Sequence, residues 1–233
     1  MTKRFFLTSG RGVLFILFAG IALVSCKKEP EYSPDIIITA FDAEKSWITC
    51  SQQKETTVVT PTGESVTTGR ISSISESTPV SFEEVKIDLG FGGRKSAPNP
   101  VLYGQVEDFL LDWLLSNEKI RNTSIEFSYC PEQVTGINFY LDDVERTCIN
   151  SSIEILPKAC RCIVSASNEL LHDLPEKMSI EDFLSLKPLL LDRYVFQFAN
   201  PPVETPAKMK LTVEIMLGNG KVLSNTTQTI NLL

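Results

Sequence analysis

Apolar and polar residues alternate along much of this chain, in short segments separated by turn-forming residues. Alternation with a period of two predicts half-buried β-strands, because successive side chains of a strand point to opposite faces of a sheet. Residues 81–91 show this alternation, residues 35–41 are a β-branched run of strand type, and residues 124–129, 136–141, 152–156, 161–166 and 193–202 are also predicted to contain strands. The spacing of about a dozen residues between the central segments is typical of an all-β sandwich. The pattern predicts a mainly β fold, a β-sandwich of the immunoglobulin-like kind.

The strongest hairpin signal lies near the C-terminus. Residues 210–217 alternate between apolar and polar, and Gly218, Asn219 and Gly220 follow as a tight turn. A turn of this composition joins antiparallel neighbours. We therefore expect residues 221–232 to run back as the partner strand.

Two segments break the strand pattern and predict helices. Residues 103–117 carry apolar side chains at helical spacing, namely Val106, Phe109, Leu110, Trp113 and Leu114. Ser179 precedes the acidic residues Glu181 and Asp182, which is typical of a capped helix start, and Pro188 ends the segment. The sequence thus adds one amphipathic helix and one short helical insert to the strands.

Residues 51–78 are rich in serine and threonine, with few bulky apolar side chains. One interpretation is a long mobile hairpin or loop that turns at the sequence PTGE or TTGR. The other is a flat, threonine-rich strand pair that a partner covers.

The N-terminal segment has the three parts of a secretory signal. Lys3, Arg4 and Arg11 form a basic start, and residues 12–24 are uncharged. This apolar stretch is shorter than the roughly 20 residues that a membrane-spanning helix needs. Charged residues and a proline follow Cys26 at once, so the helix cannot continue.

The sequence Leu23-Val24-Ser25-Cys26 resembles the lipobox of bacterial lipoproteins. The resemblance implies that residues 1–25 are removed and that Cys26 carries the lipid. Residues 26–33 would then be a tether and residues 34–233 a single domain. The expected location is the cell envelope, at the outer membrane. The sequence does not distinguish the periplasmic face from the surface face.

Charge and composition exclude some partners. The chain has 22 basic and 29 acidic residues, and removal of the leader leaves a formal charge of about −10. An acidic protein without a basic stripe disfavours binding to a phosphate backbone. Nucleic acid is therefore not expected as a partner.

Five cysteines remain once Cys26 is assigned to lipid. In an exported protein, cysteines favour disulfide bonds, although an odd number leaves at least one thiol unpaired. We expect one or two bridges among Cys130, Cys148, Cys160 and Cys162, with the pairing left open.

Few residues carry candidate chemistry. His172 is the single histidine and would be the base of an exported hydrolase, the alternative function, but no nucleophile motif accompanies it. Cys160 and Cys162 could join His172 on zinc, yet the spacing and ligand number are atypical. No catalytic residue, metal or cofactor is therefore expected.

Two further motifs have simple structural explanations. Asp142, Asp143 and Glu145 could bind calcium, but the spacing of a calcium loop is missing, which favours a solvated acidic turn. The sequence FGGRKS at 91–96 lacks the spacing of a phosphate-binding loop. Among the aromatic residues, Trp47 and Tyr103 remain as candidates for a ligand-binding face.

The whole pattern resembles small uncharacterised lipoproteins of gut and oral Bacteroidetes. The resemblance to their domain of unknown function is clearest over residues 122–233, in the motifs EFSYC, INFYL, IEILP, SIEDFLSL and KLTVEIMLGNGK. It implies an envelope location and no particular reaction. We therefore expect a noncatalytic binding or assembly component, held at the membrane by Cys26, with envelope proteins or glycans as partners.

Overall fold

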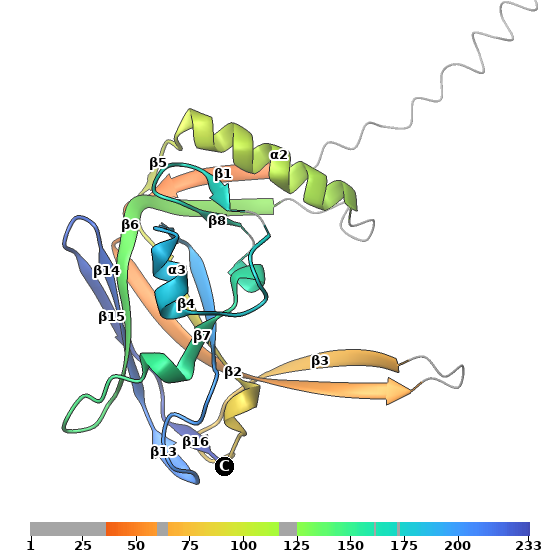
Figure 1. Ribbon diagram of the computed structural model, residues 1–233, viewed down its shortest axis with the longest axis vertical. Helices are drawn as coiled ribbons and strands as arrows, with labels where there is room; N and C mark the ends of the chain where they lie inside the picture. Colours follow the sequence, from red (N-terminus) through yellow and green to blue (C-terminus); the bar gives the residue numbers. More distant parts are fainter. Residues whose placement is uncertain (1–35, 60–64, 117–124, 161, 172) are drawn as a thin grey trace, which may run out of the picture.

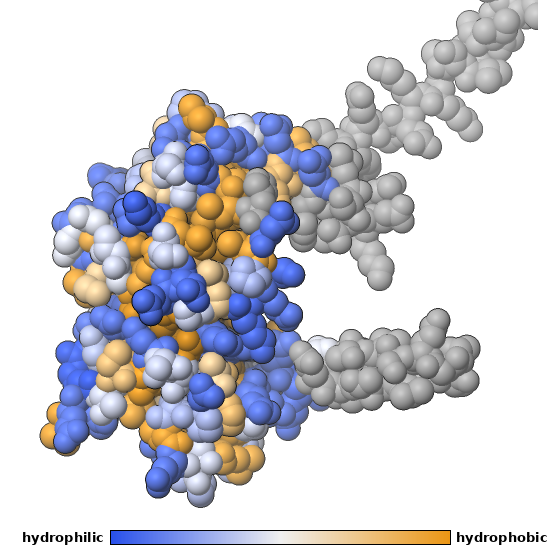
Figure 2. Space-filling model, viewed as in Figure 1, coloured by the Kyte–Doolittle hydropathy of each residue, from blue (hydrophilic) through white to orange (hydrophobic). Residues whose placement is uncertain are grey.

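The computed structural model describes residues 36–59, 65–116, 125–160, 162–171 and 173–233. This part of the chain is mainly β, with several sheets and two α-helices (Figure 1), as the alternating pattern predicts. Among the described residues, neither helix has the length and apolar character needed to cross a membrane. Figure 2 shows hydrophilic and hydrophobic residues mixed over one face, with hydrophobic residues gathered below the upper helix.

Two larger sheets contain most of the strands. The first runs β15 (Val222–Thr226), β14 (Leu211–Leu217), β6 (Ile125–Leu141), β1 (Ile36–Phe41) and β5 (Lys95–Ser96), with β11 (Leu189–Leu191) also paired to β6. The second runs β10 (Met178–Ser179), β7 (Ile153–Ile155), β12 (Arg193–Phe198), β4 (Val85–Gly92), β2 (Lys45–Val59) and β3 (Ser65–Ser73). The smaller elements are the strand pairs β13 (Ala207–Met209) with β16 (Ile230–Leu232) and β8 (Ile163–Val164) with β9 (Leu170–Leu171), and the 3-10 helices η1 (Phe82–Glu84), η3 (Asn150–Ser152) and η4 (Pro157–Cys160).

Three short connections carry the chain from one larger sheet to the other. They are residues 42–44 between β1 and β2, residues 93–94 between β4 and β5, and Asp192 between β11 and β12. The Asp42 amide donates to the Arg94 carbonyl oxygen at 3.0 Å, so the first two connections lie side by side. The three connections therefore form one corner between the sheets.

Asp192 links both sheets through its backbone. Its amide donates to the Ser128 carbonyl oxygen on β6 at 3.1 Å, and its carbonyl oxygen accepts from the Phe91 amide on β4 at 2.8 Å. Gly93 allows the closest approach at this corner, because a Cβ there would lie 1.7 Å from the carbonyl oxygen of Asp42. Backbone hydrogen bonds and one required glycine thus hold the corner together.

The two predicted strands at 124–129 and 136–141 form a single strand, β6. Its first part pairs in parallel with β1 up to Tyr129, and its last part pairs antiparallel with β14 from Val134 onward. Pro131, which suggests an interruption because it lacks an amide hydrogen, lies where the pairing partner changes. The prediction of two strands is therefore wrong in number, although both segments are strands.

The helices form where the sequence predicts them. In α2 (Pro100–Ser116), Leu102, Val106 and Leu110 are buried, and the helix packs against β1. In α3 (Ile180–Ser185), the Ser179 hydroxyl accepts a hydrogen bond from the Asp182 amide at 3.1 Å. This is the capping that the sequence indicates.

The C-terminal hairpin is confirmed in its first part. β14 and β15 pair from Thr212 opposite Thr226 to Met216 opposite Val222. The chain then leaves this hairpin, and β16 pairs with β13 instead. The predicted return strand is therefore divided between two sheets.

The serine- and threonine-rich segment forms a strand pair. β2 and β3 pair continuously from Ser51 opposite Ser73 to Val59 opposite Ser65. Figure 1 shows their outer part extending from the body as a two-stranded arm. The sequence TTGR lies inside β3, so it is not the turn; the sequence PTGE falls on residues 61–64, outside the described residues.

Candidate functional site

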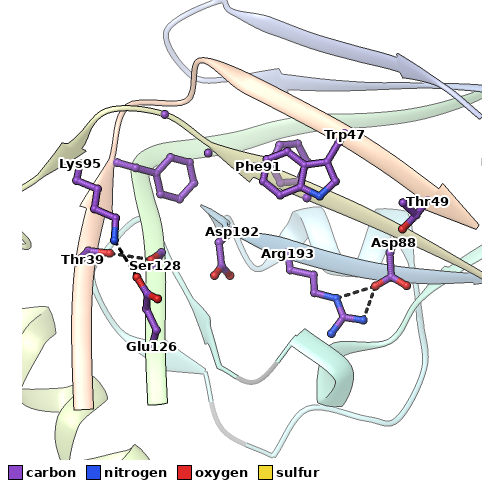
Figure 3. Close-up of a pocket in the computed structure, with 14 residues that line it drawn as sticks. Thr39, Trp47, Thr49, Asp88, Phe91, Lys95, Glu126, Ser128, Asp192 and Arg193 are labelled. Atoms are coloured by element: carbon purple, nitrogen blue, oxygen red, sulfur yellow. Dashed lines mark hydrogen bonds and ion pairs between the residues drawn. The ribbon is translucent and has the colours of Figure 1, made fainter. Parts of the chain in front are cut away.

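A polar hollow of about 550 Å³ lies at the corner between the two larger sheets (Figure 3). β1, β5 and β6 contribute residues on one side, and β2, β4 and β12 contribute residues on the other. The lining residues used below are Thr39, Trp47, Thr49, Asp88, Gly90, Phe91, Gly92, Lys95, Glu126, Ser128, Asp192 and Arg193. The connections that join the sheets therefore also bring these distant residues together.

The indole of Trp47 lies over two glycine positions of the neighbouring strand β4. Trp47 on β2 pairs with Gly90 on β4, and a Cβ on Gly90 would lie 2.1 Å from indole atoms Cε2 and Nε1. A Cβ on Gly92 would lie 3.5 Å from indole atom Cζ3. Trp47 nevertheless stays 51 % exposed. One face of the ring thus rests on the β4 backbone while the residue remains open to ligand.

Two ion pairs flank the hollow. The Arg193 Nε donates to Asp88 Oδ1 at 2.6 Å, across the neighbouring strands β12 and β4. On the other side, the Lys95 Nζ donates to Glu126 Oε1 at 2.9 Å. Each ion pair joins side chains from two different strands at the rim.

Hydroxyl groups and one further carboxylate complete the polar lining. The Thr39 and Ser128 hydroxyl oxygens lie 2.7 Å apart on the paired strands β1 and β6. Figure 3 shows Asp192 between the two ion pairs. The hollow therefore presents hydrogen-bond donors and acceptors close to one exposed aromatic ring.

The lining carries a slight negative charge. Three of its charged residues are acidic (Asp88, Glu126 and Asp192) and two are basic (Lys95 and Arg193). Because both of these basic groups already pair with carboxylates, the described part of the lining offers no concentrated positive charge to an anion. The arrangement favours a neutral, hydrogen-bonding ligand.

The two aromatic candidates from the sequence lie in different places. Trp47 lines the hollow, whereas Tyr103 on α2 is half-buried and packs against the core. Cys26 and His172 lie outside the described residues, so the lipid site and the proposed catalytic base have no structural description.

The predicted disulfide bonds are not supported. Cys130 and Cys160 are buried free thiols, and Cys148 is an exposed one. The Cys160 thiol donates to the Leu156 carbonyl oxygen at 3.3 Å, and burial raises the pKa of the Cys130 thiol. Cys162 is buried as well. Cys130, Cys160 and Cys162 serve as small core residues, a use that composition alone does not distinguish from bridging.

The acidic segment at 142–145 is a turn. Asp143 accepts hydrogen bonds from the Thr147 amide at 3.1 Å and the Thr147 hydroxyl at 3.0 Å. The hydrogen bond from the Thr147 amide is the main reason that the pKa of Asp143 is lowered. Within the described part of the chain, no group of three or more histidine, cysteine, aspartate or glutamate side chains is arranged to hold a metal ion.

The hollow also contains residues that the sequence did not single out. Asp88, Glu126, Asp192 and Arg193 come from separate segments, and only the tertiary fold joins them. One signal was available: glycines two residues apart, as at Gly90 and Gly92, leave the same face of a strand bare for a large neighbouring side chain.

A second hollow, of about 760 Å³, lies near the base of the arm. Its lining is rich in charged residues, including Glu83, Lys86, Lys158 and Lys177, and none of its described lining residues is aromatic. It lacks the combination of an exposed ring and ordered polar groups, so the hollow at Trp47 is the stronger candidate.

No protein-family model matches this chain, and no curated protein or solved structure matches it either.

Proposed function

We propose that this protein is a noncatalytic binding component of the cell envelope, anchored by a lipid on Cys26, and that the hollow at Trp47 is its binding site. The observation that carries the proposal is the position of the Trp47 indole, which lies over Gly90 of β4 and borders the hollow. A half-exposed indole that lies over Gly90, in a hollow that also contains hydroxyl groups and two ion pairs, combines an apolar surface with convergent polar groups, as ligand sites do.

The envelope location and the likeness to Bacteroidetes lipoproteins belong to the same proposal. They are supported by the basic start, the short apolar stretch and the lipobox-like sequence before Cys26. The partner is then an envelope molecule, protein or glycan, that the tethered domain can reach from the membrane.

We also propose that the two larger sheets form an immunoglobulin-like sandwich. The proposal is supported by their shared core, in which Phe139 on β6 and Phe196 on β12 meet edge to face with ring centroids 5.0 Å apart. A sandwich of this kind would leave its connecting segments free to carry a binding site.

The binding site can be tested on the full chain extracted from its own envelope in mild detergent. Native mass spectrometry should detect a noncovalently bound component on the unchanged protein. Trp47→Ala should lose that component, because the ring that contacts it is gone. Ile71→Ala is the matched control: it removes another exposed apolar side chain, on β3 and away from the hollow, and should keep the component.

An unchanged protein that carries no component, or a component retained equally by Trp47→Ala, would contradict the proposed site. Circular dichroism of both variants checks that each is folded.

A further inference from the structure

We propose that the hollow at Trp47 binds a neutral saccharide, with one sugar ring stacked on the indole. This inference rests on the proposed function and specifies the class of ligand. It is argued from the shape of the aromatic surface, from the polar groups around it and from their charge.

The aromatic surface suits a ring with an apolar face. A pyranose presents C–H groups on its flat faces and hydroxyls around its edge, so it stacks on an aromatic ring while its hydroxyls stay available. Gly90 and Gly92 support one face of the Trp47 indole, which leaves the exposed part of the residue for such stacking. Because the ring is already seated, binding costs little side-chain entropy.

The polar groups suit the edge of a sugar. Each sugar hydroxyl both donates and accepts hydrogen bonds, so it needs donors and acceptors close together. The rim offers Arg193 beside Asp88 and Lys95 beside Glu126, while Asp192 lies between these pairs. Adjacent hydroxyls of one ring can therefore bond to both partners of an ion pair.

The charges disfavour two other classes of ligand. Both basic residues of the lining, Lys95 and Arg193, are neutralised by carboxylates, so an anionic ligand gains little. A quaternary ammonium ligand usually requires several aromatic faces. Here Phe91, although it borders the hollow, is 3 % exposed, which leaves Trp47 as the accessible ring among the described lining residues.

The size of the hollow suits a short stretch of saccharide. A volume of about 550 Å³ lies within the range of small-molecule sites and has room for roughly two or three sugar rings. A single stacking ring in an open site should give a Kd of about 0.01 to 1 mM.

The test is a titration of the full chain with defined neutral tetrasaccharides, in a detergent that has no sugar headgroup. The probes are β-1,4- and β-1,3-linked glucose, β-1,4-linked mannose, xylose and N-acetylglucosamine tetramers. Trp113→Phe leaves Trp47 as the single tryptophan, so a change in emission reports on this ring. At least one probe should shift the emission with a saturating curve, and calorimetry of the unchanged protein should give the same Kd.

Variants at Trp47 and at Gly90 make the test specific. Trp47→Ala should raise the Kd measured by calorimetry at least tenfold, and Trp47→Phe, which keeps an aromatic ring, should raise it less. Gly90→Ala should also weaken binding about tenfold, because its Cβ cannot coexist with the seated indole. Gly69→Ala, on β3, is the matched control, since a Cβ there meets Gln53 Nε2 at an ordinary 3.6 Å, and it should bind as the unchanged protein does.

Several results would overturn the inference. They are no saturable binding of any tetramer, equal binding by Trp47→Ala, or tighter binding of choline, inorganic phosphate or a galacturonate tetramer than of the neutral probes. The two proposals fail separately. If the component lost from the envelope-extracted Trp47→Ala protein is not a carbohydrate, the binding site stands and the saccharide inference falls.

Discussion

At the scale of single residues, the seating of Trp47 depends on what is missing from β4. The indole occupies the space that a side chain at Gly90 would fill, and a Cβ on Gly92 would be in ordinary contact with the ring. A tryptophan in an exposed strand position would otherwise move among several rotamers. Gly90 thus gives the exposed indole room to lie over the β4 backbone.

The cysteines differ at the same scale in their surroundings. Burial raises the pKa of Cys50 to about 12, with a further contribution from the Asp88 charge. Burial also raises the pKa of Cys160 to about 12. Cys148, by contrast, is exposed. Since the thiolate is the reactive form, these thiols should differ widely in reactivity.

We predict one fast-reacting thiol in native Cys26→Ser protein treated with an aromatic disulfide reagent at pH 8. Cys148→Ser should abolish the fast phase, whereas Cys50→Ser should leave it unchanged. Labelling of the slow thiols should rise about tenfold per pH unit toward pH 10, because their thiolate fraction does so below a pKa of about 12. Absence of a fast phase, with mass mapping that finds a bridge to Cys148, would contradict the assignment.

The raised pKa values also set the direction of a stability change. An unfolded thiol has a pKa of about 8.5, so the unfolded chain releases these protons at lower pH than the folded one. The contribution of Cys50 and Cys160 to stability is therefore full below about pH 8.5 and declines as the pH rises toward 12. The midpoint of urea unfolding should accordingly be lower at pH 10 than at pH 7.5.

At the scale of elements, the short helix α3 depends for its stability on its N-terminal cap and on its packing against the core. Six residues form too few internal hydrogen bonds for independent stability. Its buried residues Ile180 and Phe183 attach it to the core, where Phe183 meets Tyr194 edge to face at 5.5 Å. The Ser179 cap satisfies an amide at the start of the helix, at Asp182.

We predict that Ser179→Ala lowers the free energy of unfolding by about 0.5 to 2 kcal/mol, the usual cost of losing such a cap. Urea denaturation followed by circular dichroism measures the change. Ser185→Ala is the control within the same helix. Its exposed hydroxyl donates to the Asp182 carbonyl oxygen at 2.6 Å but caps no helix start, so its effect should be smaller. Equal losses in the two variants would argue against the capping role.

The arm is the element for which the pattern of apolar and polar residues in the sequence was least informative about secondary structure. Threonine and valine favour extended structure, but residues 51–78 lack the alternation of bulky apolar and polar residues that usually marks a strand. Backbone pairing between β2 and β3 defines the arm instead. Because β2 continues from the arm into the sheet beside β4, its first half is fixed by the body and its second half extends outward.

At the scale of the whole molecule, one corner performs two tasks. The connections at 42–44, 93–94 and Asp192 join the sheets, and the same corner forms the hollow. A ligand there would contact both sheets at once. We therefore expect ligand binding to raise the melting temperature of the whole domain rather than of one sheet.

We predict that Cys26→Ala releases the protein from the membrane fraction or leaves a precursor with the leader attached. The reason is that the acyl chains on Cys26 would be the attachment to the bilayer. Fractionation and intact-mass measurement read out the change, and Cys148→Ala serves as a control for loss of a cysteine. Unchanged mass and fractionation in Cys26→Ala would refute the lipid anchor.

Local patterns in the sequence determined the class of fold and many of its parts. Alternation at 81–91, helical spacing at 103–117 and the capping signal at Ser179 correspond to β4, α2 and α3, because each depends on neighbours within a few residues. Trp47 could also be named as a candidate, since its aromatic character is a property of one residue.

Only the tertiary structure decided which distant segments meet. It joined 124–129 and 136–141 into β6, placed Cys130, Cys160 and Cys162 in the core, and brought Asp88, Glu126 and Arg193 into one hollow with Trp47. Strand pairing and side-chain proximity between residues far apart in the chain depend on how the sheets pack. That packing is a property of the whole core, so no short stretch of sequence specifies it.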